Sequence, residues 1–245
     1  MRSYAIGDIH GHSGLLQEAH ARIAADRAAC GDDAAPIVHL GDLVDRGPDS
    51  AGVIRTLREG IARGENWIVL KGNHDRLFER FLTMPDWRDP RMSHDVTYLH
   101  PVVGGAETLI SYGLFRPSAF HIRKVHADAR AAVPQDDLDF LAERPLTYSC
   151  GQVLYVHAGI RPGVPFDAQD EEDLLWIREP FLSDTRDHGL LVIHGHTAIP
   201  RPMHYRNRVN IDSRAAYGGP LTAIVVENRQ VWTLTESGRA SLLPL

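Results

Sequence analysis

Residues 3–11 read SYAIGDIHG, a short apolar run that ends in a glycine turn carrying Asp8 and His10. Two runs of the same kind follow, PIVHLGDLVDRG at residues 36–47 and WIVLKGNHD at residues 67–75. Each run contains aliphatic or β-branched residues before its glycine, which is typical of a buried strand. The stretches between them, residues 15–29 and 50–63, carry apolar residues at helical spacing. This alternation predicts an α/β fold in which parallel strands are joined by helical crossovers.

Further apolar runs extend the pattern towards the C-terminus. Strands are predicted at residues 3–6, 36–40 and 67–70, and again at 153–156, 190–193, 208–211, 221–226 and 230–234. Residues 227–229, which separate the last two, are typical of a hairpin turn. Ser13 and Asp49 stand where the N-caps of the first two helices are expected.

Residues 76–146 have a different character. They contain helical patterns at 76–82, 106–112, 119–131 and 135–142 and little strand signal. Residues 83–101 are rich in Pro, Asp and His and predict a long surface loop, a type of segment that is often functional in a compact domain. We therefore expect a single domain over residues 1–245, with residues 76–146 as a helical insertion within it.

Composition excludes several classes of protein. With 245 residues and 43% apolar side chains, the chain has enough apolar surface for a sizeable core, which rules out wholesale disorder. A net charge of −6 without a block of like charges argues against a nucleic acid or a membrane as a partner held by charge. Cys30 and Cys150 are too few for a disulfide framework and suit a reducing compartment. No signal-peptide pattern and no run of about 18 apolar residues is visible, so we expect a soluble cytoplasmic protein.

Five clusters of metal-ligand residues follow predicted strands. Besides GDIHG, GDLVDRG and GNHD, they are HAG at residues 157–159 and HGHT at residues 194–197. A single Gly-Asp pair is more often a turn than a ligand, and isolated histidines such as His39, His100 and His188 are more often surface or satisfied core residues. In open α/β sheets, however, ligands bind beyond the carboxyl ends of the strands. Five successive clusters in that position therefore predict one functional site.

The residue types in these clusters indicate the chemistry. They supply a mixed carboxylate, imidazole and amide set: Asp8, His10, Asp42, Asn73, His157 and His196. Such a set favours Mn²⁺, Fe or Zn²⁺ over a Ca²⁺ site built from oxygen alone. Six ligands are more than one tetrahedral metal site needs, and a carboxylate can bridge two ions. We therefore expect two ions about 3.5–4 Å apart. Such a pair clamps a phosphoryl group and makes hydroxide available at neutral pH.

The ordered series GDIHG, GDLVDRG, GNHD, HAG and GHT resembles the phosphoprotein phosphatase family of the calcineurin-like metallophosphoesterases. The resemblance is to its bacterial and phage members, which include protein serine/threonine phosphatases and symmetrical diadenosine tetraphosphatases. It implies a four-layer sandwich of mixed β-sheets flanked by helices. It also implies that Asp8, His10 and Asp42 hold the first metal, and that Asp42 bridges to a second. The second is completed by Asn73, His157 and His196, with Mn²⁺ as the first choice and Fe or Zn²⁺ as alternatives.

Two positions depart from the patterns of relatives. Ala198 stands where broader relatives place a further histidine, as is usual in the phosphoprotein phosphatase branch, and the neighbouring His194 is expected not to be a ligand. Ser213 and Arg214 follow Asp212 where the family usually reads Asp-Thr-Gly. Arg214 is therefore either a positive contact for an acidic or polyphosphate substrate or a solvent-facing loop residue.

Other residues are candidates for catalysis. His74 follows the ligand Asn73 and is the candidate general acid. Asp45 comes three residues after Asp42 and is expected to orient that imidazole, with a turn or helix-capping carboxylate as the alternative.

Arginines are the candidates for holding phosphate. Arg46 is expected to bind two phosphate oxygens, because guanidinium geometry matches a tetrahedral oxyanion. Arg178 resembles the family's second phosphate-binding arginine, with a surface charge as the alternative, and Arg161 is a weaker candidate. The expected reaction is in-line attack by metal-bound hydroxide, with Arg46 and Arg178 offsetting charge and His74 protonating the leaving oxygen.

The resemblance leaves two substrate classes. The leading hypothesis is a protein serine/threonine phosphatase with broad phosphomonoesterase activity, and the alternative is a symmetrical bis(5'-nucleosyl)-tetraphosphatase. Residues 104–113 and 217–219 resemble members of both kinds, so the partner is a phosphorylated protein or a small phosphoester such as a dinucleoside polyphosphate. A catalytically inactive scaffold is disfavoured because no ligand is missing. Neither a G-x-S-x-G elbow nor a Walker motif is present.

Overall fold

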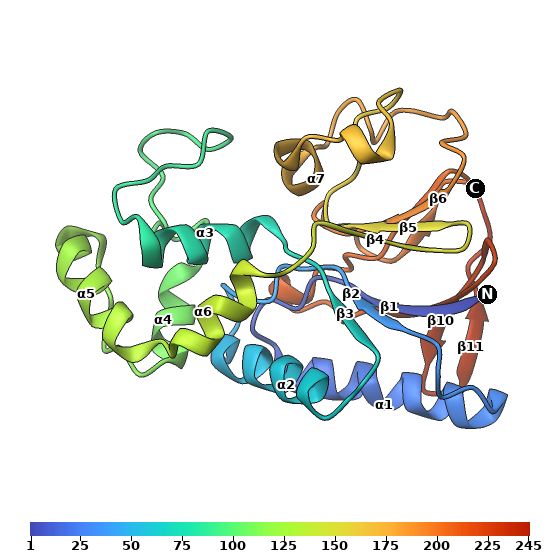
Figure 1. The fold of residues 1–245 in the computed structure, drawn as a ribbon, viewed down its shortest axis with the longest axis horizontal. Helices are drawn as coiled ribbons and strands as arrows, with labels where there is room; N and C mark the ends of the chain where they lie inside the picture. The colour runs from blue at the N-terminus through green and yellow to red at the C-terminus, as the bar shows by residue number, and fades with distance from the viewer.

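The computed structural model describes residues 1–245 and contains two mixed β-sheets with helices on their outer faces (Figure 1). The six-stranded sheet has the order β11 (Gly238–Ser241), β10 (Gln230–Thr235), β9 (Ala223–Glu227), β1 (Arg2–Ile6), β2 (Ile37–His39) and β3 (Trp67–Val69). The five-stranded sheet has the order β4 (Thr147–Cys150), β5 (Val153–Val156), β6 (Leu191–His194), β8 (Arg208–Asn210) and β7 (Met203–His204). The predicted α/β class with mixed sheets is confirmed.

Each sheet contains three adjacent parallel strands, which lie at one end of the six-stranded sheet and in the middle of the five-stranded sheet. β1, β2 and β3 are mutually parallel in one sheet, and β5, β6 and β8 are mutually parallel in the other. The remaining strands pair antiparallel at the flanks, and β9 and β10 are joined by the predicted turn after Glu227. All eight predicted strands are present, with boundaries that differ by two residues at most. The predicted strand–helix–strand crossovers are therefore confirmed.

Successive side chains of a strand point to opposite faces of its sheet, and in β1 and β5 the two faces pack into different buried clusters. In β1, Tyr4 and Ile6 pack into a cluster shared with the helices, whereas Ala5 packs into a cluster shared with the second sheet. In β5, Val153 and Tyr155 belong to that inter-sheet cluster. Leu154 and Val156 face outward and pack with residues that follow β5 in the chain, among them Leu174, Ile177 and Phe181. The two sheets are thus packed face to face and covered on both outer sides.

Helices α1 (Ser13–Cys30) and α2 (Ser50–Ala62) cover the six-stranded sheet and lie along the lower edge of Figure 1. The side chain of Asp49 accepts a hydrogen bond from the backbone N–H of Gly52 and caps α2, as predicted. The prediction of Ser13 as the N-cap of α1 was wrong, because His12 holds that position. The Ser13 hydroxyl instead donates to Asp49 Oδ2 at 2.6 Å and joins the starts of the two helices.

Four helices gather at one end of the molecule, at the left of Figure 1. They are α3 (Asn73–Thr83), α4 (Gly105–Ser111), α5 (Ile122–Ala132), which follows a 3₁₀ turn at Ala119–His121, and α6 (Gln135–Ala142). The four predicted helices of residues 76–146 are confirmed. The first of them begins earlier than expected, so that Asn73 and His74 belong to the first turn of α3.

The connection between α3 and α4 contains no helix or strand, but it is not wholly a surface loop as predicted. It buries Asp89, Tyr98 and Leu99. Asp89 accepts a hydrogen bond from Arg76 Nη2 of α3 at 2.8 Å, and both side chains are at most 5% exposed. A buried ion pair of this kind holds the connection against α3.

Several short elements were not predicted. The six-residue helix α7 (Glu171–Trp176) is capped by Asp170, and 3₁₀ turns lie at Phe166–Ala168 and Ala215–Tyr217. Strands β4 and β7 are short and form the edges of the five-stranded sheet. β11 begins with glycine and is mostly exposed. Segments this short carry little periodic signal, and they form because a neighbouring strand or helix provides the partner.

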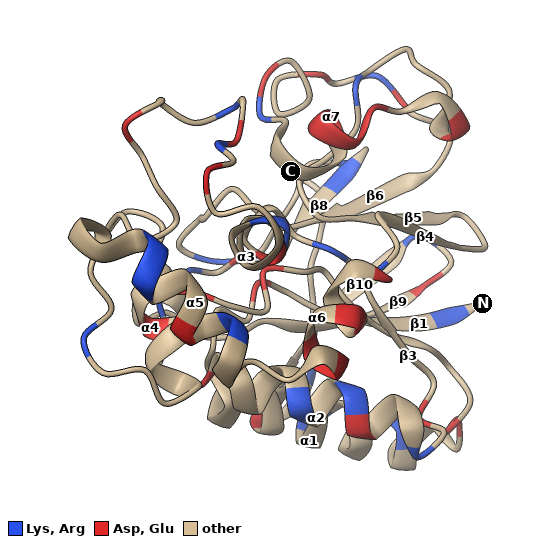
Figure 2. Cartoon of the chain, turned by 60° about the vertical axis from the view of Figure 1, so that its left-hand side comes forward, with Lys and Arg blue, Asp and Glu red and all other residues tan.

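Charge is distributed over the surface without a dominant sign. Figure 2 shows acidic and basic positions interspersed along α1 and α2, which is compatible with the modest net charge of −6. None of the helices has both the length and the hydropathy that crossing a bilayer requires. Cys30 is exposed and Cys150 is buried, and both are free thiols.

We predict that Gly60→Ala destabilises the protein by about 1–3 kcal/mol, because the added methyl group overpacks the contact between α2 and β3. A Cβ atom at Gly60 would lie 1.9 Å from the Trp67 ring. That ring is itself stacked on His20, with 4.3 Å between centroids, and cannot simply rotate away.

Gly14→Ala is the matched control, since Gly14 also lies in a helix but a Cβ there meets nothing within 4 Å. The free energy of unfolding of this variant should rise by about 0.5 kcal/mol, because alanine restricts the conformations of the unfolded chain. Urea unfolding midpoints of both variants test the pair. Equal effects of the two substitutions would contradict the predicted overpacking.

Candidate active site

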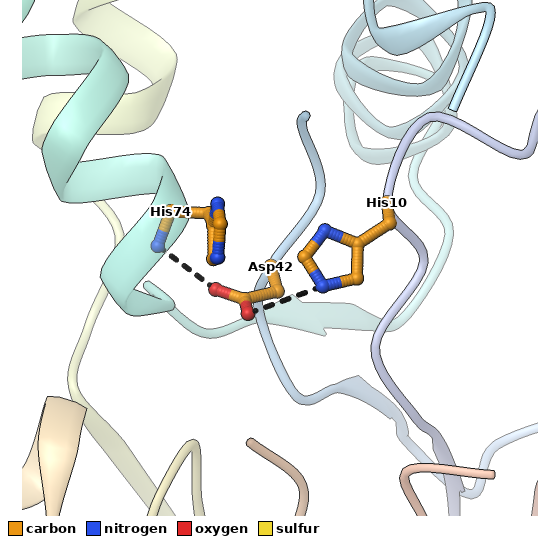
Figure 3. A group of neighbouring side chains, drawn as sticks. All are labelled: His10, Asp42 and His74. Atoms are coloured by element: carbon orange, nitrogen blue, oxygen red, sulfur yellow. Dashed lines mark hydrogen bonds and ion pairs between the residues drawn. The ribbon is translucent and has the colours of Figure 1, made fainter. Parts of the chain in front are cut away.

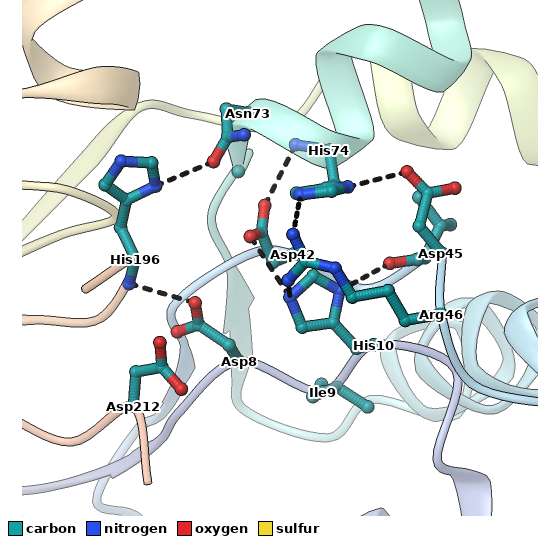
Figure 4. A network of polar contacts seen from close by, with 12 residues as sticks. Asp8, Ile9, His10, Asp42, Asp45, Arg46, Asn73, His74, His196 and Asp212 are labelled. Atoms are coloured by element: carbon teal, nitrogen blue, oxygen red, sulfur yellow. Dashed lines mark hydrogen bonds and ion pairs between the residues drawn. The ribbon is translucent and has the colours of Figure 1, made fainter. Parts of the chain in front are cut away.

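The carboxyl ends of the parallel strands from both sheets meet at one place. The turns after β1, β2 and β3 deliver residues from one side, and the turns after β5, β6 and β8 deliver residues from the other. Across this junction the His196 backbone N–H donates to Asp8 Oδ2 at 2.9 Å, and His157 Nε2 lies 2.9 Å from Asn73 Oδ1. The structure therefore brings together all six predicted metal ligands, as Figure 4 shows for five of them.

Asp42 lies at the centre of this junction. Its Oδ2 is 3.5 Å from His10 Nε2, and its Oδ1 is 3.4 Å from His157 Nε2. Asp42 thereby takes part in two separate groups whose ligand atoms lie within 4.8 Å of one another, one with His10 and His74 and the other with His157 and His196 (Figure 3 shows the first). Because each carboxylate oxygen faces a different group, Asp42 has the geometry of a bridging ligand.

Unpaired polar atoms and backbone strain indicate that these residues fit cations. Asp8 Oδ1 and His196 Nε2 are buried and have no hydrogen-bond partner, which leaves lone pairs that a metal ion would satisfy. His10, Asp42 and His196 have φ angles of 45°, 47° and 63°, in the left-handed region that L-residues rarely adopt. Such strain persists only where the surrounding structure enforces it, and it is concentrated at functional sites.

Three carboxylates share this buried space. Burial, together with the charges of Asp212 and Asp42, raises the pKa of Asp8 well above its ordinary value. Burial raises the pKa of Asp212 to about 6, and Asp42 adds to this effect. Burial also acts to raise the pKa of Asp42, but the surrounding imidazoles, His157 first, outweigh it and lower that pKa. Bound cations would relieve the mutual repulsion of these carboxylates.

The imidazoles are in the protonation state that a metal requires. Burial lowers the pKa of His10, His157 and His196, so these rings are neutral at pH 7. His10 Nδ1 lies 2.8 Å from the Val44 carbonyl, and His157 Nδ1 lies 2.9 Å from the Leu40 carbonyl. Since a carbonyl only accepts, Nδ1 carries the proton in both rings. Each Nε2 therefore carries the lone pair that a metal ligand needs.

Arg46 lies beside the candidate metal group formed by His10, Asp42 and His74. Its Nη1 donates to His10 Nε2 at 2.8 Å and its Nη2 donates to His74 Nε2 at 2.9 Å. The guanidinium packs over the Tyr217 ring at 5.3 Å and forms no ion pair with a carboxylate. His10 Nε2 has a single lone pair, so Arg46 and a cation are alternative partners for it. The positive charge of Arg46 is thus available to an anionic ligand.

His74 and Asp45 form the predicted pair. His74 Nδ1 lies 2.7 Å from Asp45 Oδ2, and Asp45 is fully buried. The other Asp45 oxygen accepts hydrogen bonds from the hydroxyl groups of Tyr98 and Thr108. The carboxylate accepts no backbone N–H, so the alternative interpretation of Asp45 as a turn or capping residue is wrong. The contacts of Tyr98 and Thr108 were not predicted, because they join residues 53 and 63 positions away.

Asp75 has a structural role that the sequence analysis missed. Its Oδ1 accepts from the Leu43 backbone N–H at 2.9 Å, and its Oδ2 accepts from Gly72 N–H at 2.7 Å. These bonds tie together the turns that follow β2 and β3. Burial, with the nearby charge of Asp42, raises the pKa of Asp75 to about 7.

A cavity of about 470 Å³ opens above this junction. One side is apolar and includes Leu77 with residues of the α3–α4 connection: Met92, Val96, Val102 and Val103. The rings of Trp176 and Tyr217 also line it, together with Arg46, Arg178 and Asp212. Asp212 was missed as a site residue, although it follows the end of β8 as the other candidates follow their strands.

The remaining arginine and histidine candidates lie in different places. Arg178 lines the cavity, is exposed and forms no ion pair. Arg161 instead pairs with Asp173 at 2.5 Å and does not reach the cavity. Arg214 is exposed and also lies outside the cavity lining. His194 contacts Arg208 and the Gly195 carbonyl and belongs to neither candidate metal group.

Ion pairs connect the two walls of the cavity. Arg76 of α3 contacts Glu172 of α7 at 2.6 Å, and Arg91 of the α3–α4 connection contacts Asp173 of α7 at 2.9 Å. Trp176 is the last residue of helix α7, and Arg178 follows it by two positions. These contacts therefore hold the segment that carries both cavity residues against the opposite wall.

We predict that the protein equilibrated with Mn²⁺ and freed of excess metal retains about two ions per chain. Asp42→Ala removes the residue shared by both groups and should lower the metal content to less than about one ion per chain. His196→Ala should leave about one ion per chain. Elemental analysis measures the ratio. His100→Ala, which changes an exposed histidine outside the site, is the control and should retain the full complement. Unchanged metal content in Asp42→Ala would contradict the bridging assignment.

Comparisons with known proteins agree with this geometry. The chain is 29% identical to serine/threonine-protein phosphatase 1 of Salmonella typhimurium over 89% of each protein. It is 24% identical to an asymmetrical bis(5'-nucleosyl)-tetraphosphatase of Anoxybacillus flavithermus, over 89% of this chain and 88% of that one. The crystal structure of a cold-active protein-tyrosine phosphatase from a Shewanella species shares the fold, with a TM-score of 0.61 and 17% identity over 99% of this chain and 80% of that one.

A family model places the chain among known proteins. The model of the calcineurin-like phosphoesterases matches residues 1–225, which include every candidate metal ligand described above. The relatives named as phosphatases and tetraphosphatases match over nearly the same extent. The chain therefore belongs to the calcineurin-like phosphoesterases and is a metal-dependent hydrolase of phosphate esters.

Proposed function

We propose that the protein is a phosphomonoesterase that acts on phosphoserine and phosphothreonine in proteins. The observation that carries this proposal is the pair of His74 and Asp45 at the cavity. His74 Nδ1 is held by a fully buried carboxylate, and its Nε2 lies beside Arg46, where an anionic group would bind. In the structure Arg46 Nη2 donates to His74 Nε2, so His74 becomes a proton donor when Arg46 turns to a bound phosphate and Nε2 takes up a proton instead.

A proton donor matters most when the leaving group is an alcohol. Cleavage of a serine or threonine phosphate breaks the P–O bond and leaves the electron pair on an alkoxide-like oxygen. Water supplies the oxygen that becomes bonded to phosphorus. His74 gives its Nε2 proton to the departing oxygen, and a positioned acid of this kind typically contributes about 10²–10⁴-fold. Asp45 stabilises the charged imidazolium before the proton is transferred.

The other residues of the site bind the phosphate and the metals. Arg46 and Arg178 form no ion pairs and offset the negative charge on the phosphate oxygens. Asp8, His10, Asp42, Asn73, His157 and His196 would hold two divalent cations, for which we propose Mn²⁺ first and Fe or Zn²⁺ as alternatives. When bound, the cations make hydroxide available at neutral pH and stabilise charge on the phosphoryl group.

A dinucleoside tetraphosphatase is the second candidate. The rings of Trp176 and Tyr217 at the cavity favour it, because planar aromatic side chains stack on nucleobases. The similarity to a bis(5'-nucleosyl)-tetraphosphatase points the same way. In that reaction, however, the leaving group is a phosphate that departs without needing a proton, so the paired His74 and Asp45 would contribute little.

We predict a preference of about 100-fold or more in kcat/KM for phosphoserine or phosphothreonine peptides over diadenosine tetraphosphate, because discrimination of this size reflects differences in transition-state binding. A side-by-side assay with Mn²⁺ measures this preference, and phosphotyrosine peptides in the same assay measure whether tyrosine phosphates are also cleaved. A comparable preference for diadenosine tetraphosphate would overturn the proposal and support the second candidate.

We also predict that His74→Asn lowers kcat on phosphoserine by about 10²-fold or more, but lowers it far less on p-nitrophenyl phosphate. Nitrophenolate is a good leaving group that barely needs a proton. Steady-state rates on both substrates test this, with elemental analysis to verify that the variant keeps its Mn²⁺. Equal losses on the two substrates would remove His74 from the acid role.

A further inference from the structure

We propose that Tyr98 and Thr108 are positioning residues that hold Asp45, and through it His74, in the geometry required for proton donation. The inference rests on the proposed function, because it concerns the orientation of His74, which donates a proton to an alcohol leaving group. Neither residue belongs to a strand-end cluster. Tyr98 lies in the connection between α3 and α4, and Thr108 lies within α4.

The hydrogen bonds to Asp45 are divided between its two oxygens. Tyr98 Oη donates to Oδ1 at 2.6 Å and Thr108 Oγ1 donates to the same oxygen at 2.8 Å, while Oδ2 faces His74 Nδ1 at 2.7 Å. Asp45 is 0% exposed and has no arginine or lysine partner. A buried carboxylate of this kind depends on its donors, because each unmade hydrogen bond leaves a desolvated charge. The two hydroxyl groups thus fix the carboxylate plane that orients the His74 ring.

Thr108 also holds the backbone beneath the carboxylate. Its Oγ1 accepts from the Asp45 backbone N–H at 2.8 Å and lies 3.0 Å from Ser50 Oγ. Asp45 and Arg46 have φ angles of 71° and 69°, a strained conformation for residues other than glycine. The Arg46 N–H donates to the Gly104 carbonyl at 3.0 Å, and Gly104 itself has a φ of 81° that permits this close approach. Residues 98–108 therefore support both the carboxylate and the neighbouring arginine.

The Tyr98 ring has its own packing, separate from its hydroxyl group. It stacks on Phe78 and Phe81 of α3, with 5.7 Å and 4.8 Å between ring centroids. A phenylalanine ring would pack in the same way. The hydroxyl group of Tyr98 therefore serves only the hydrogen bond to Asp45. Tyr98 also follows Met92 and Val96 of the cavity wall in one continuous segment. The segment that meets the substrate thus also orients the proton donor.

Tyr98→Phe should lower kcat on phosphoserine by about 5- to 20-fold and change KM by less than about twofold, since a fraction of the general-acid contribution is lost. On p-nitrophenyl phosphate, kcat should change by less than about twofold. A defect in folding or metal binding would lower both rates together. A lower kcat on phosphoserine, whose leaving group is poor, with an unchanged kcat on p-nitrophenyl phosphate is therefore what a positioning role predicts.

Tyr112→Phe is the matched control. Tyr112 also stacks on Phe78, with 5.9 Å between centroids, but its hydroxyl group donates to Asp137 Oδ2 rather than to Asp45. This variant should leave both rates unchanged. Thr108→Val and Thr108→Ser provide a second pair, in which valine should reproduce the selective loss and serine should restore activity by retaining the hydroxyl group.

The outcomes separate this inference from the proposed function. If His74→Asn shows no selectivity between the two substrates, the acid role fails and this inference is overturned with it. If His74→Asn is selective but Tyr98→Phe matches Tyr112→Phe on both substrates, only the present inference is overturned. Equal losses in Tyr98→Phe on both substrates would also overturn it. Should Tyr98→Phe fail to fold, the same comparison is decided by Thr108→Val against Thr108→Ser.

Discussion

The structure depends on the burial of negative charge where two sheets meet. Asp42 is 2% exposed, and each of its oxygens faces a histidine from a different side of the junction. Such a carboxylate is tolerated because neutral imidazoles, backbone N–H groups and potential cation sites surround it. The strained backbone at His10, Asp42 and His196 has the same origin, since each turn must aim its side chain at one point. The packed apolar layers on either side make this arrangement rigid enough to persist.

Local patterns predicted the sheet and most of the candidate site because both follow one rule. A strand-like run closely followed by a carboxylate, amide or imidazole side chain locates a residue at the carboxyl end of a parallel strand, and this rule found Asp8, Asn73 and His157. It would also have found Asp212. It could not find Tyr98 or Thr108, because their contacts with Asp45 arise from packing between segments far apart in the chain. The helix α7 and the edge strands were missed for a related reason, since only tertiary contacts stabilise such short elements.

The cavity is shaped by segments that lie outside the sheets. The α3–α4 connection supplies an apolar wall, and the end of α7 and the chain just beyond it supply Trp176 and Arg178. Arg76 contacts both Asp89 of the connection and Glu172 of α7, so a single buried guanidinium joins the two sides. The sheets therefore bring the candidate metal ligands together, whereas these charged contacts hold the two walls of the cavity against each other.

The position of Asn73 and His74 in the first turn of α3 has a mechanical consequence. These neighbours project from one rigid helical turn, so the spacing between an amide ligand and the proton donor is set by covalent geometry. His157 and His196, in contrast, reach the junction from the opposite sheet. A metal ion bound to Asn73 and to these histidines would act as a cross-link between the two layers. Loss of the ion would remove this cross-link and leave the apolar cluster between the sheets to hold them together, while the amide and the imidazole of α3 would keep their spacing.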